Sequence, residues 1–322
     1  TISPAGRENY QNKAECQPKI RCRGRKMDAK SAVALGIIRT LGLLNLPLAR
    51  GFGHLMGDAL RLTNSRMYKV TLKNIELCFP QMTKAEQLDL AKQSMRETAK
   101  AVAEMGIAWA GTEKKFRRNE SRIKNIHNFH LFEKAIADGK GLLMLAMHYG
   151  NWEMVTSCLP RRCDMMAIYK VAKMPGFEKA MLEARTVSGL KMVPADKGGV
   201  KKITDHYVAK KAVFIVPDQE PAEKSGTWSE FFGVKTLTPK FINFLIQKNP
   251  EGTVLNITIK RVKGGFDLIF TEAEPEIYSE DVEVSALAMN KGFEKCIAGD
   301  LSQYQWEYKR FKSNPEQHYK GF

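Results

Sequence analysis

Two side chains five positions apart, His148 and Glu153, form the pattern in this chain that is best suited to chemistry. A neutral imidazole can take a proton from a substrate hydroxyl, and a carboxylate beside it fixes the tautomer and stabilises the imidazolium cation that forms. Positions five apart on one helix diverge by about 140° around its axis, so a continuous helix would keep the two side chains apart. The pair meets only if the backbone turns between them.

The residues around this pair predict such a turn. An apolar run at 141–147 has the composition of a buried strand, and Gly150 with Asn151 follows it. Asn151 is a favoured N-cap residue, and a carboxylate in the first helical turn, where Glu153 would lie, is stabilised by the helix dipole. We therefore expect His148 and Glu153 to meet at the carboxyl end of a strand, which is where open α/β sheets bind ligands.

Other common catalytic and cofactor-binding patterns are missing from the sequence. It has no Gly-x-Ser-x-Gly elbow, no Gly-x-x-x-x-Gly-Lys phosphate loop and no Gly-x-Gly-x-x-Gly dinucleotide motif. His127 and His130 are three apart, but no further ligand lies close to them in the sequence, and we expect no metal and no cofactor. The alternative to a catalytic His148 is a structural histidine packed behind a strand. We favour a general base acting on a bound hydroxyl.

Alternating apolar runs and helical patterns organise the chain from residue 67 onward. A capping box at 83–86 opens a long helix that continues to about Trp109, and a last helix covers roughly 284–297. Strands alternate with helices between them, which predicts an α/β fold with a central mixed β-sheet flanked by helices. We expect strands at 141–147, 165–169, 192–193 and 212–216, helices at 152–158, 177–188 and 200–207, and an antiparallel hairpin formed by 253–261 and 266–270.

The N-terminal part of the chain differs in character from the rest. Residues 1–26 show neither a helical nor a strand period, and we expect a disordered extension or a segment added upstream. Residues 31–49 are nearly all apolar, with Arg39 as their only charge, and approach the length of a membrane span. An asparagine and a proline within them favour a helix that lies in the membrane interface instead. We expect 27–66 to be a membrane-anchoring helix region, with a buried helix of a soluble core as the alternative.

The chain is strongly basic, with a formal net charge of +16 over 322 residues. The first 26 residues contribute +5 of this charge, which leaves +11 on the remainder. A basic surface suits nucleic acid, an anionic membrane surface or an acidic protein partner. No helix-turn-helix or RNA-binding signature appears, so we expect no nucleic-acid partner. Six cysteines without a Cys-x-x-Cys pair indicate reduced thiols in a cytoplasmic setting.

Several motifs, in their shared order, resemble those of the bacterial lipid A secondary acyltransferases, the lauroyl and myristoyl transferases. Residues 141–153 resemble that family's catalytic strand and His-x4-acid motif, and 73–80 resemble its Asn-(Leu/Ile)-x-x-Cys-Phe-Pro segment. Lys170 departs from the arginine that the family commonly has there. Tyr169-Lys170 resembles the family's Tyr-Arg, Arg185 with Gly189 resembles its Arg-x-x-x-Gly, and Asp218-Gln219 resembles its Asp-Gln. Residues 231–233 resemble its Phe-Phe-Gly, and 303–311 resemble its carboxy-terminal motif.

The resemblance implies an enzyme that transfers a fatty acyl chain from an acyl-carrier-protein thioester to a hydroxyl of a lipid A precursor. It implies a catalytic acyltransferase domain at 67–322, with His148 as general base oriented by Glu153 and slow thioester hydrolysis as a side reaction. It also implies an anionic membrane surface as partner, at the cytoplasmic face of the inner membrane of a Gram-negative bacterium. The substrate-binding residues that it implies are Arg185, Asn151, Lys170, Asp218 and Gln219. For Arg185 two roles stay open, bidentate pairing with an acceptor phosphate or with the catalytic carboxylate.

Two other functions remain as alternatives. Glycerolipid acyltransferases of the lysophosphatidate type also use a His-x4-acid pair, but usually with aspartate after an Asn-His-x-Ser run. Here Met147 precedes His148 and Gly150 follows, which favours the lipid A group. The alternative from another class is a basic protein that binds membrane or nucleic acid without catalysis. Turnover of an acyl thioester distinguishes an acyltransferase from such a binding protein.

Overall fold

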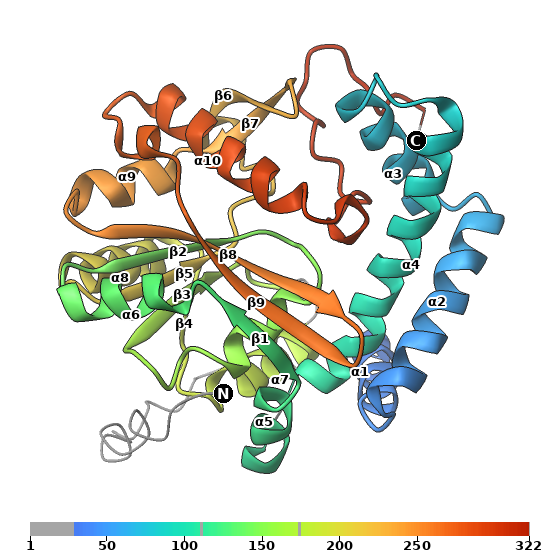
Figure 1. The fold of residues 1–322 in the computed structure, drawn as a ribbon, viewed down its shortest axis with the longest axis horizontal. Helices are drawn as coiled ribbons and strands as arrows, with labels where there is room; N and C mark the ends of the chain where they lie inside the picture. The colour runs from blue at the N-terminus through green and yellow to red at the C-terminus, as the bar shows by residue number, and fades with distance from the viewer. Residues whose placement is uncertain (1–28, 110–111, 173–174, 322) are drawn as a thin grey trace.

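A seven-stranded mixed sheet lies at the centre of the computed structural model, which describes residues 29–109, 112–172 and 175–321 (Figure 1). In chain order its strands are β1 (Ile123–His127), β2 (Leu142–Ala146), β3 (Met165–Tyr169), β4 (Lys191–Pro194), β5 (Ala212–Ile215), β8 (Thr253–Val262) and β9 (Gly265–Glu272). The strand order is β1-β9-β8-β2-β5-β3-β4. Strands β8, β2, β5, β3 and β4 are parallel to one another, whereas β9 pairs antiparallel with β8 and parallel with β1.

The α-helices are α1 (Ala29–Leu41), α2 (Leu46–Leu62), α3 (Arg66–Cys78), α4 (Lys84–Ala108), α5 (Glu113–Glu120), α6 (Phe129–Asp138), α7 (Pro175–Thr186), α8 (Lys197–Val208), α9 (Phe241–Lys248) and α10 (Val282–Ile297). Shorter elements are the 3-10 helices η2 (Trp152–Ser157), η3 (Glu223–Ser225), η4 (Pro275–Tyr278) and η5 (Leu301–Gln303), and the hairpin of β6 (Gly226–Phe231) and β7 (Val234–Pro239).

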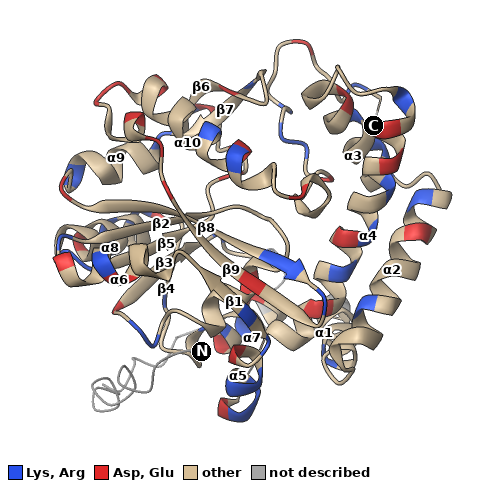
Figure 2. Ribbon diagram, in the orientation of Figure 1, with Lys and Arg blue, Asp and Glu red and all other residues tan. Residues whose placement is uncertain are grey.

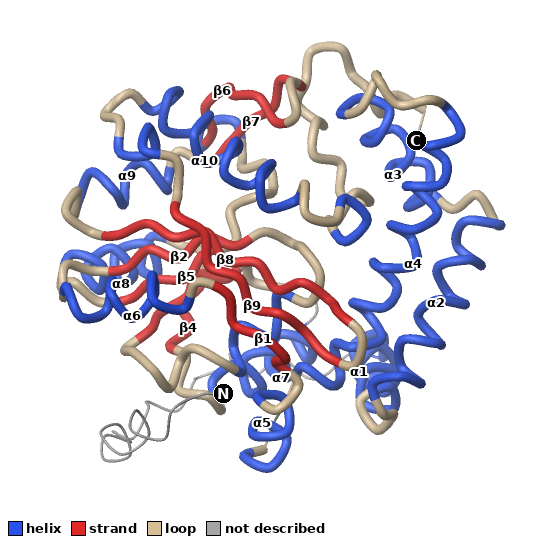
Figure 3. The backbone as a smooth tube through the Cα atoms, in the orientation of Figure 1, coloured by secondary structure: helices blue, strands red, loops and turns tan. Residues whose placement is uncertain are grey.

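Helices cover both faces of the sheet, and each face has its own apolar core (Figure 3). Helices α3, α8, α9 and α10 and the β6–β7 hairpin contribute to one core, and α6, η2 and the C-terminal end of α4 contribute to the other. Successive residues of β2 point to opposite faces, so Leu143 lies in the first core and Met144 in the second. Because both faces of the sheet are covered, the central strands β2, β3 and β5 are continuous apolar runs. The predicted α/β fold with a central mixed sheet flanked by helices is confirmed.

Most elements lie where the sequence predicts them, to within a few residues. The capping box of Thr83 and Glu86 is formed, and it begins α4 at Lys84. The segment after Asn151 is a 3-10 helix instead of the expected α-helix. Helices α3, α5 and α9, strand β1 and the β6–β7 hairpin were not predicted. In the three strands, polar residues leave no clear apolar run; β1, for example, is exposed at three of its five positions.

The apolar segment at 31–49 forms two helices and not one. Helix α1 ends at Leu41, and α2 begins at Leu46 after Asn45, whose side chain accepts a hydrogen bond from the Leu48 N–H. An N-cap asparagine with a proline in the first turn is a strong signal for a new helix. Among the described residues, no helix is both long enough and apolar enough to cross a bilayer. The extension predicted at 1–26 lies outside the described residues, and the domain boundary at residue 66 stays a prediction.

Helices α2 and α4 lie side by side over much of their length (Figures 1 and 2). Gly53 and Gly57 of α2 face α4, and a Cβ atom on either glycine would lie 2.6 Å from a Cα atom of that helix. The two backbones therefore approach closely, and charged side chains bridge them. Arg96 of α4 donates two hydrogen bonds of 2.8 Å to Asp58 of α2.

Candidate active site

His148 lies in the turn after β2, at the carboxyl edge of the parallel strands. Its carbonyl oxygen accepts a 3.0 Å hydrogen bond from the Gln305 N–H, and the Gly150 N–H donates to the Gln303 carbonyl at 2.9 Å. Gly150 has a φ of 55°, and a Cβ atom there would lie 1.9 Å from the Ile259 carbonyl oxygen. Only glycine tolerates both conditions. Strand β8 and the carboxy-terminal segment thus fix the turn that carries His148.

Asp218 makes the hydrogen bond that orients the His148 ring. It follows β5, the neighbour of β2 in the sheet, and is 2% exposed. Its Oδ1 lies 2.6 Å from His148 Nδ1, and its Oδ2 accepts a 2.9 Å hydrogen bond from the His148 backbone N–H. A carboxylate only accepts, so Nδ1 carries the proton, and Nε2 is left as the ring nitrogen that can accept one from a substrate.

The electrostatics of this pair favour the charged form of both partners. Burial alone lowers the pKa of His148, but the charge of Asp218 and its hydrogen bond raise it by more, with smaller contributions from Glu307 and Glu153. Burial alone raises the pKa of Asp218, but the charge of His148 and two hydrogen bonds lower it by more. The imidazole pKa therefore lies above its usual range and the carboxyl pKa below its own. This stabilises the imidazolium that a general base becomes.

Glu153 does not take the orienting position predicted for it. Both of its carboxylate oxygens are held by Arg185, whose Nε and Nη2 donate at 3.0 and 2.5 Å. The Arg185 guanidinium also lies 5.0 Å from the centre of the Trp152 ring, which makes an edge contact with His148. Of the two roles left open for Arg185, the structure shows pairing with the carboxylate. Glu153 lies on a 3-10 helix, and its carboxylate points toward Arg185 in the last turn of α7 and away from the His148 ring.

The Glu153–Arg185 pair is buried, so its two charges depend on each other. The side chains are 6% and 10% exposed. We expect Glu153→Ala to lower the free energy of unfolding by about 3–5 kcal/mol, because it leaves a buried cation without its partner. The matched control is Glu113→Ala, which breaks the exposed pair with Arg161 and should cost under about 1 kcal/mol. Denaturant unfolding measures both, and equal losses would contradict the prediction.

Of the other predicted site residues, two line the cavity, and the side chains of the other two are engaged by groups of the protein. Lys170 is exposed and lines the cavity, and Gln219 lines it with its side chain 3.4 Å from Gln305. Asn151 is 3% exposed and donates to Glu104 at 3.1 Å, so it neither caps a helix nor faces a ligand. Asp218 was expected to bind substrate. Its carboxylate is buried and engaged by His148 instead.

A cavity of about 380 Å³ opens beside His148 and extends between the sheet and α7. Arg185 contributes to its polar end. The remaining lining is mostly apolar, and strand register explains how it is arranged: Ala167 of β3 pairs with Met192 of β4 and with Phe214 of β5, and all three line the cavity. A row of apolar side chains thus runs across three strands beneath the catalytic edge. Such a cavity accepts an extended apolar group and presents its reactive end to His148.

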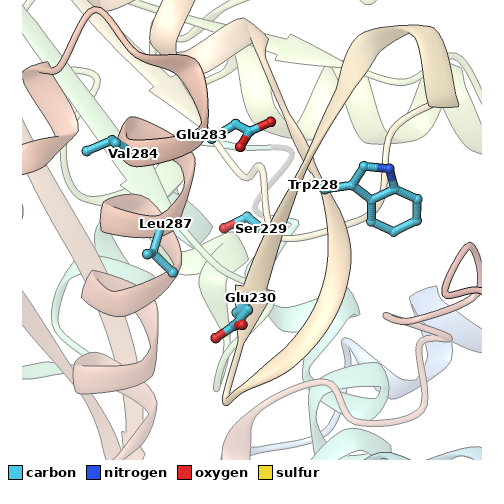
Figure 4. A pocket seen from close by; sticks show the side chains of 6 residues that line it. All are labelled: Trp228, Ser229, Glu230, Glu283, Val284 and Leu287. Atoms are coloured by element: carbon cyan, nitrogen blue, oxygen red, sulfur yellow. The ribbon is translucent and has the colours of Figure 1, made fainter.

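A second hollow, of about 290 Å³, lies between β6 and α10 (Figure 4). It contains two carboxylates, Glu230 and Glu283, but neither a histidine nor a basic residue. Across the described ranges, no three His, Cys, Asp or Glu side chains are grouped so that they could hold a metal ion. The cavity beside His148 is therefore the better candidate for chemistry.

Asp218 could have been found as the partner of His148 only with knowledge of the strand order. Asp218 follows an apolar strand, as His148 does, and the carboxyl ends of neighbouring parallel strands meet at one edge. Strands β2 and β5 are neighbours in space but about 70 positions apart in the chain. The sequence does not state which strands are neighbours.

The chain is similar to known proteins along most of its length. The family model described as bacterial lipid A biosynthesis acyltransferase matches residues 25–313. A lipid A biosynthesis palmitoleoyltransferase of Escherichia coli strain K12 is 25% identical over 283 residues, which cover 87% of this chain and 90% of that protein. A lipid A biosynthesis acyltransferase of Haemophilus influenzae is 23% identical over 292 residues, 88% and 91% of the two chains. A lipid A biosynthesis lauroyltransferase of E. coli K12 is 22% identical over 286 residues, 88% and 92%.

Proposed function

The chain belongs to the bacterial lipid A biosynthesis acyltransferase family, and from this we propose that it transfers a fatty acyl chain from an acyl-carrier-protein thioester to a hydroxyl of a lipid A precursor. The observation that carries the proposal is the hydrogen-bonded Asp218–His148 pair beside a largely apolar cavity. A base with a fixed tautomer suits an acceptor hydroxyl, whose own pKa is high. The cavity suits the apolar chain that is transferred.

In the proposed reaction, His148 Nε2 takes the proton of the acceptor hydroxyl as the oxygen attacks the thioester carbonyl carbon. The tetrahedral intermediate collapses, so that a carbon–oxygen bond replaces the carbon–sulfur bond. The thiolate leaves and takes the proton back from the imidazolium, which yields an ester and a free thiol. Asp218 holds Nδ1–H and stabilises the cation between these steps. Arg185 lines the cavity, and the part of its guanidinium that Glu153 does not engage, Nη1, is the group that we propose donates to the oxyanion. Water in place of the acceptor gives slow thioester hydrolysis.

We also propose that α1 and α2 rest on an anionic membrane surface, at the cytoplasmic face of the bacterial inner membrane. Both helices leave large apolar side chains exposed, with Val33 of α1 at 63% and Leu55 and Leu62 of α2 at 70% and 71%. Leu43, between the two helices, is 81% exposed. Arg39 and Arg61 lie at the C-terminal ends of the two helices, where they can meet acidic headgroups. Helix α1 packs on α7, which contributes to the cavity wall. A lipid acceptor would therefore reach His148 from this side.

Polar substitutions on this face should weaken membrane binding. We expect the double variant Leu55→Ser with Leu62→Ser to bind vesicles of phosphatidylcholine and phosphatidylglycerol at least about tenfold more weakly. Each substitution removes apolar surface that the membrane would otherwise bury. The control is Val208→Ser with Phe244→Ser, two exposed apolar residues on α8 and α9. Co-sedimentation with the vesicles measures binding. Equal binding by wild type and the α2 variant would show that this face does not contact the membrane.

Incubation of the purified protein with an acyl-carrier-protein thioester and a lipid A precursor tests the proposed function directly. Mass spectrometry should show the precursor gaining one acyl chain and the donor losing it. A glycerolipid acyltransferase would instead acylate lysophosphatidate. A protein that turns over no acyl thioester but binds duplex DNA with a steep salt dependence would contradict the proposal and favour the non-catalytic alternative.

A further inference from the structure

A buried carboxylate outside the cavity connects the active-site turn to the helices on the surface. Glu104 of α4 is fully buried, and three groups from different elements donate to it. Arg261, at the end of β8, donates through Nε at 3.0 Å and through Nη2 at 2.9 Å. Arg50 of α2 donates at 2.6 Å, and the Asn151 amide of the turn donates at 3.1 Å. Glu104 is thus the common acceptor of a helix, a strand and the turn that carries His148.

Arg261 also holds the turn by its backbone. Arg261 Nη2 donates to the Gly150 carbonyl oxygen at 3.1 Å. The backbone of Arg261 exchanges two hydrogen bonds with the Gln303 side chain, of 2.7 and 3.0 Å, and the Gln303 carbonyl accepts from the Gly150 N–H. The turn is therefore tied through Gly150 and through Asn151, which lie two and three residues beyond His148, whose backbone N–H donates to Asp218.

The hydrogen-bonded network around Glu104 also holds α2 in place. Beyond its contact with Glu104, Arg50 donates from Nη1 to the Val262 carbonyl at 2.5 Å and from Nη2 to the Gly265 carbonyl at 2.8 Å. Arg50 is largely buried, with 15% of its side chain exposed, whereas Leu48 and Leu55 of the same helix are 59% and 70% exposed. One face of α2 is thus open to the surroundings, and another is ion-paired through α4 to the active-site turn.

We propose that Glu104 is a positioning residue, through which α2 and α4 hold the His148 turn in its productive geometry. Glu104 does not line the cavity, so it acts through Asn151 and Arg261. Buried ion networks add little stability over apolar packing of the same volume, but they hold groups in defined places. A base must lie within hydrogen-bond reach of the hydroxyl that it deprotonates, so a small displacement of the turn lowers turnover. The inference rests on the proposed function, because acyl transfer is one of its readouts.

Glu104→Gln keeps the side chain's shape and removes its charge. We expect kcat to fall by about tenfold or more while KM changes by less than about twofold, because binding surfaces are unchanged and only the base is displaced. The matched control is Arg96→Gln, which breaks the Arg96–Asp58 pair between the same two helices without a contact to the turn. We expect the control to leave kcat unchanged. Arg50→Gln should lower kcat, with partial rescue by Arg50→Lys.

A double-mutant cycle separates positioning from general destabilisation. If Glu104 acts through Asn151, then Asn151→Ala combined with Glu104→Gln should lower kcat no further than the larger single effect. Independent effects that multiply would overturn this route. Amide hydrogen exchange at Gly150 and Asn151 should be faster in Glu104→Gln than in wild type or Arg96→Gln. If Glu104→Gln does not fold, the folded Asn151→Ala and Arg50→Gln variants decide: wild-type kcat and exchange in both would overturn the inference.

These experiments also distinguish failure of the inference from failure of the proposed function. A wild-type protein that turns over no acyl thioester contradicts the proposed function, and hydrogen exchange still tests whether Glu104 holds the turn. An active wild type with an equally active Glu104→Gln variant contradicts only the inference.

Discussion

Replacement of His148 by alanine should lower the rate of acyl transfer by about 10²- to 10⁴-fold, which is the contribution of a positioned general base. The acceptor hydroxyl would then have to lose its proton to water as it attacks the thioester. The fold should survive, because the His148 side chain is 19% exposed and the backbone N–H that donates to Asp218 is kept. Asp218 also keeps the electrostatic stabilisation that it receives from Arg310.

The control for this variant is His206→Ala. His206 is buried, at 7% exposed; its ring faces the Asp164 carbonyl oxygen at 3.1 Å and does not line the cavity. We expect the control to transfer acyl chains at a near-normal rate. Steady-state transfer at saturating donor, with circular dichroism of both proteins, makes the comparison. Near-normal transfer by a folded His148→Ala protein would remove His148 from the mechanism.

Wild-type activity should rise with pH along a limb that reports the pKa of His148. A general base works only when it is neutral, so protonation at low pH removes activity. Since Asp218 raises the pKa of the ring above its ordinary value of about 6.5, the midpoint of this limb should lie above that pH. A pH profile of kcat/KM measures it. A midpoint well below the ordinary value would mean that burial outweighs the Asp218 charge.

Local sequence was sufficient to place His148 and insufficient to find its partner. The apolar run at 141–147 and the turn residues after it lie within a few positions of His148, so propensity and spacing locate the base at a strand end. Asp218 reaches the same place only through the pairing of β2 with β5, a contact between distant parts of the chain. Glu153 was a plausible partner by spacing alone. A long-range contact with Arg185, which no local pattern contains, directs it elsewhere.

The same distinction holds for the rest of the fold. The long helix with its capping box at Thr83 and the parallel strands follow from periodicity, because packing on both faces requires apolar runs. The break between α1 and α2 follows from Asn45 and Pro47, two residues that argue against a membrane span and also mark the start of a new helix. The Glu104 network had no local signal: α4 carries Glu104, and its partners come from α2, β8 and the turn.

Asp218→Asn should be nearly as damaging to transfer as loss of His148, although it changes a single atom. The amide has one acceptor oxygen where the carboxylate has two, and two groups compete for it: the His148 backbone N–H and the Nδ1–H of its ring. The backbone N–H cannot change its role, so the amide oxygen should turn to it. The NH₂ group then faces Nδ1, which must become an acceptor, and the proton moves to Nε2. A ring with a protonated Nε2 cannot accept the proton of a substrate hydroxyl.

The pH dependence of the Asp218→Asn variant distinguishes this tautomer effect from a simple loss of charge. We expect transfer to fall by about 10²- to 10⁴-fold, as when the orienting carboxylate of a catalytic triad is replaced by its amide. Without the negative charge of Asp218 the pKa of His148 falls, so the remaining activity should rise with pH along a limb at lower pH than in wild type. If lost charge were the only defect, the variant would match wild type once both rings are neutral. Because deprotonation does not correct a wrong tautomer, the variant should still transfer more slowly than wild type on the alkaline plateau. A plateau rate equal to that of wild type would contradict the role assigned to Asp218.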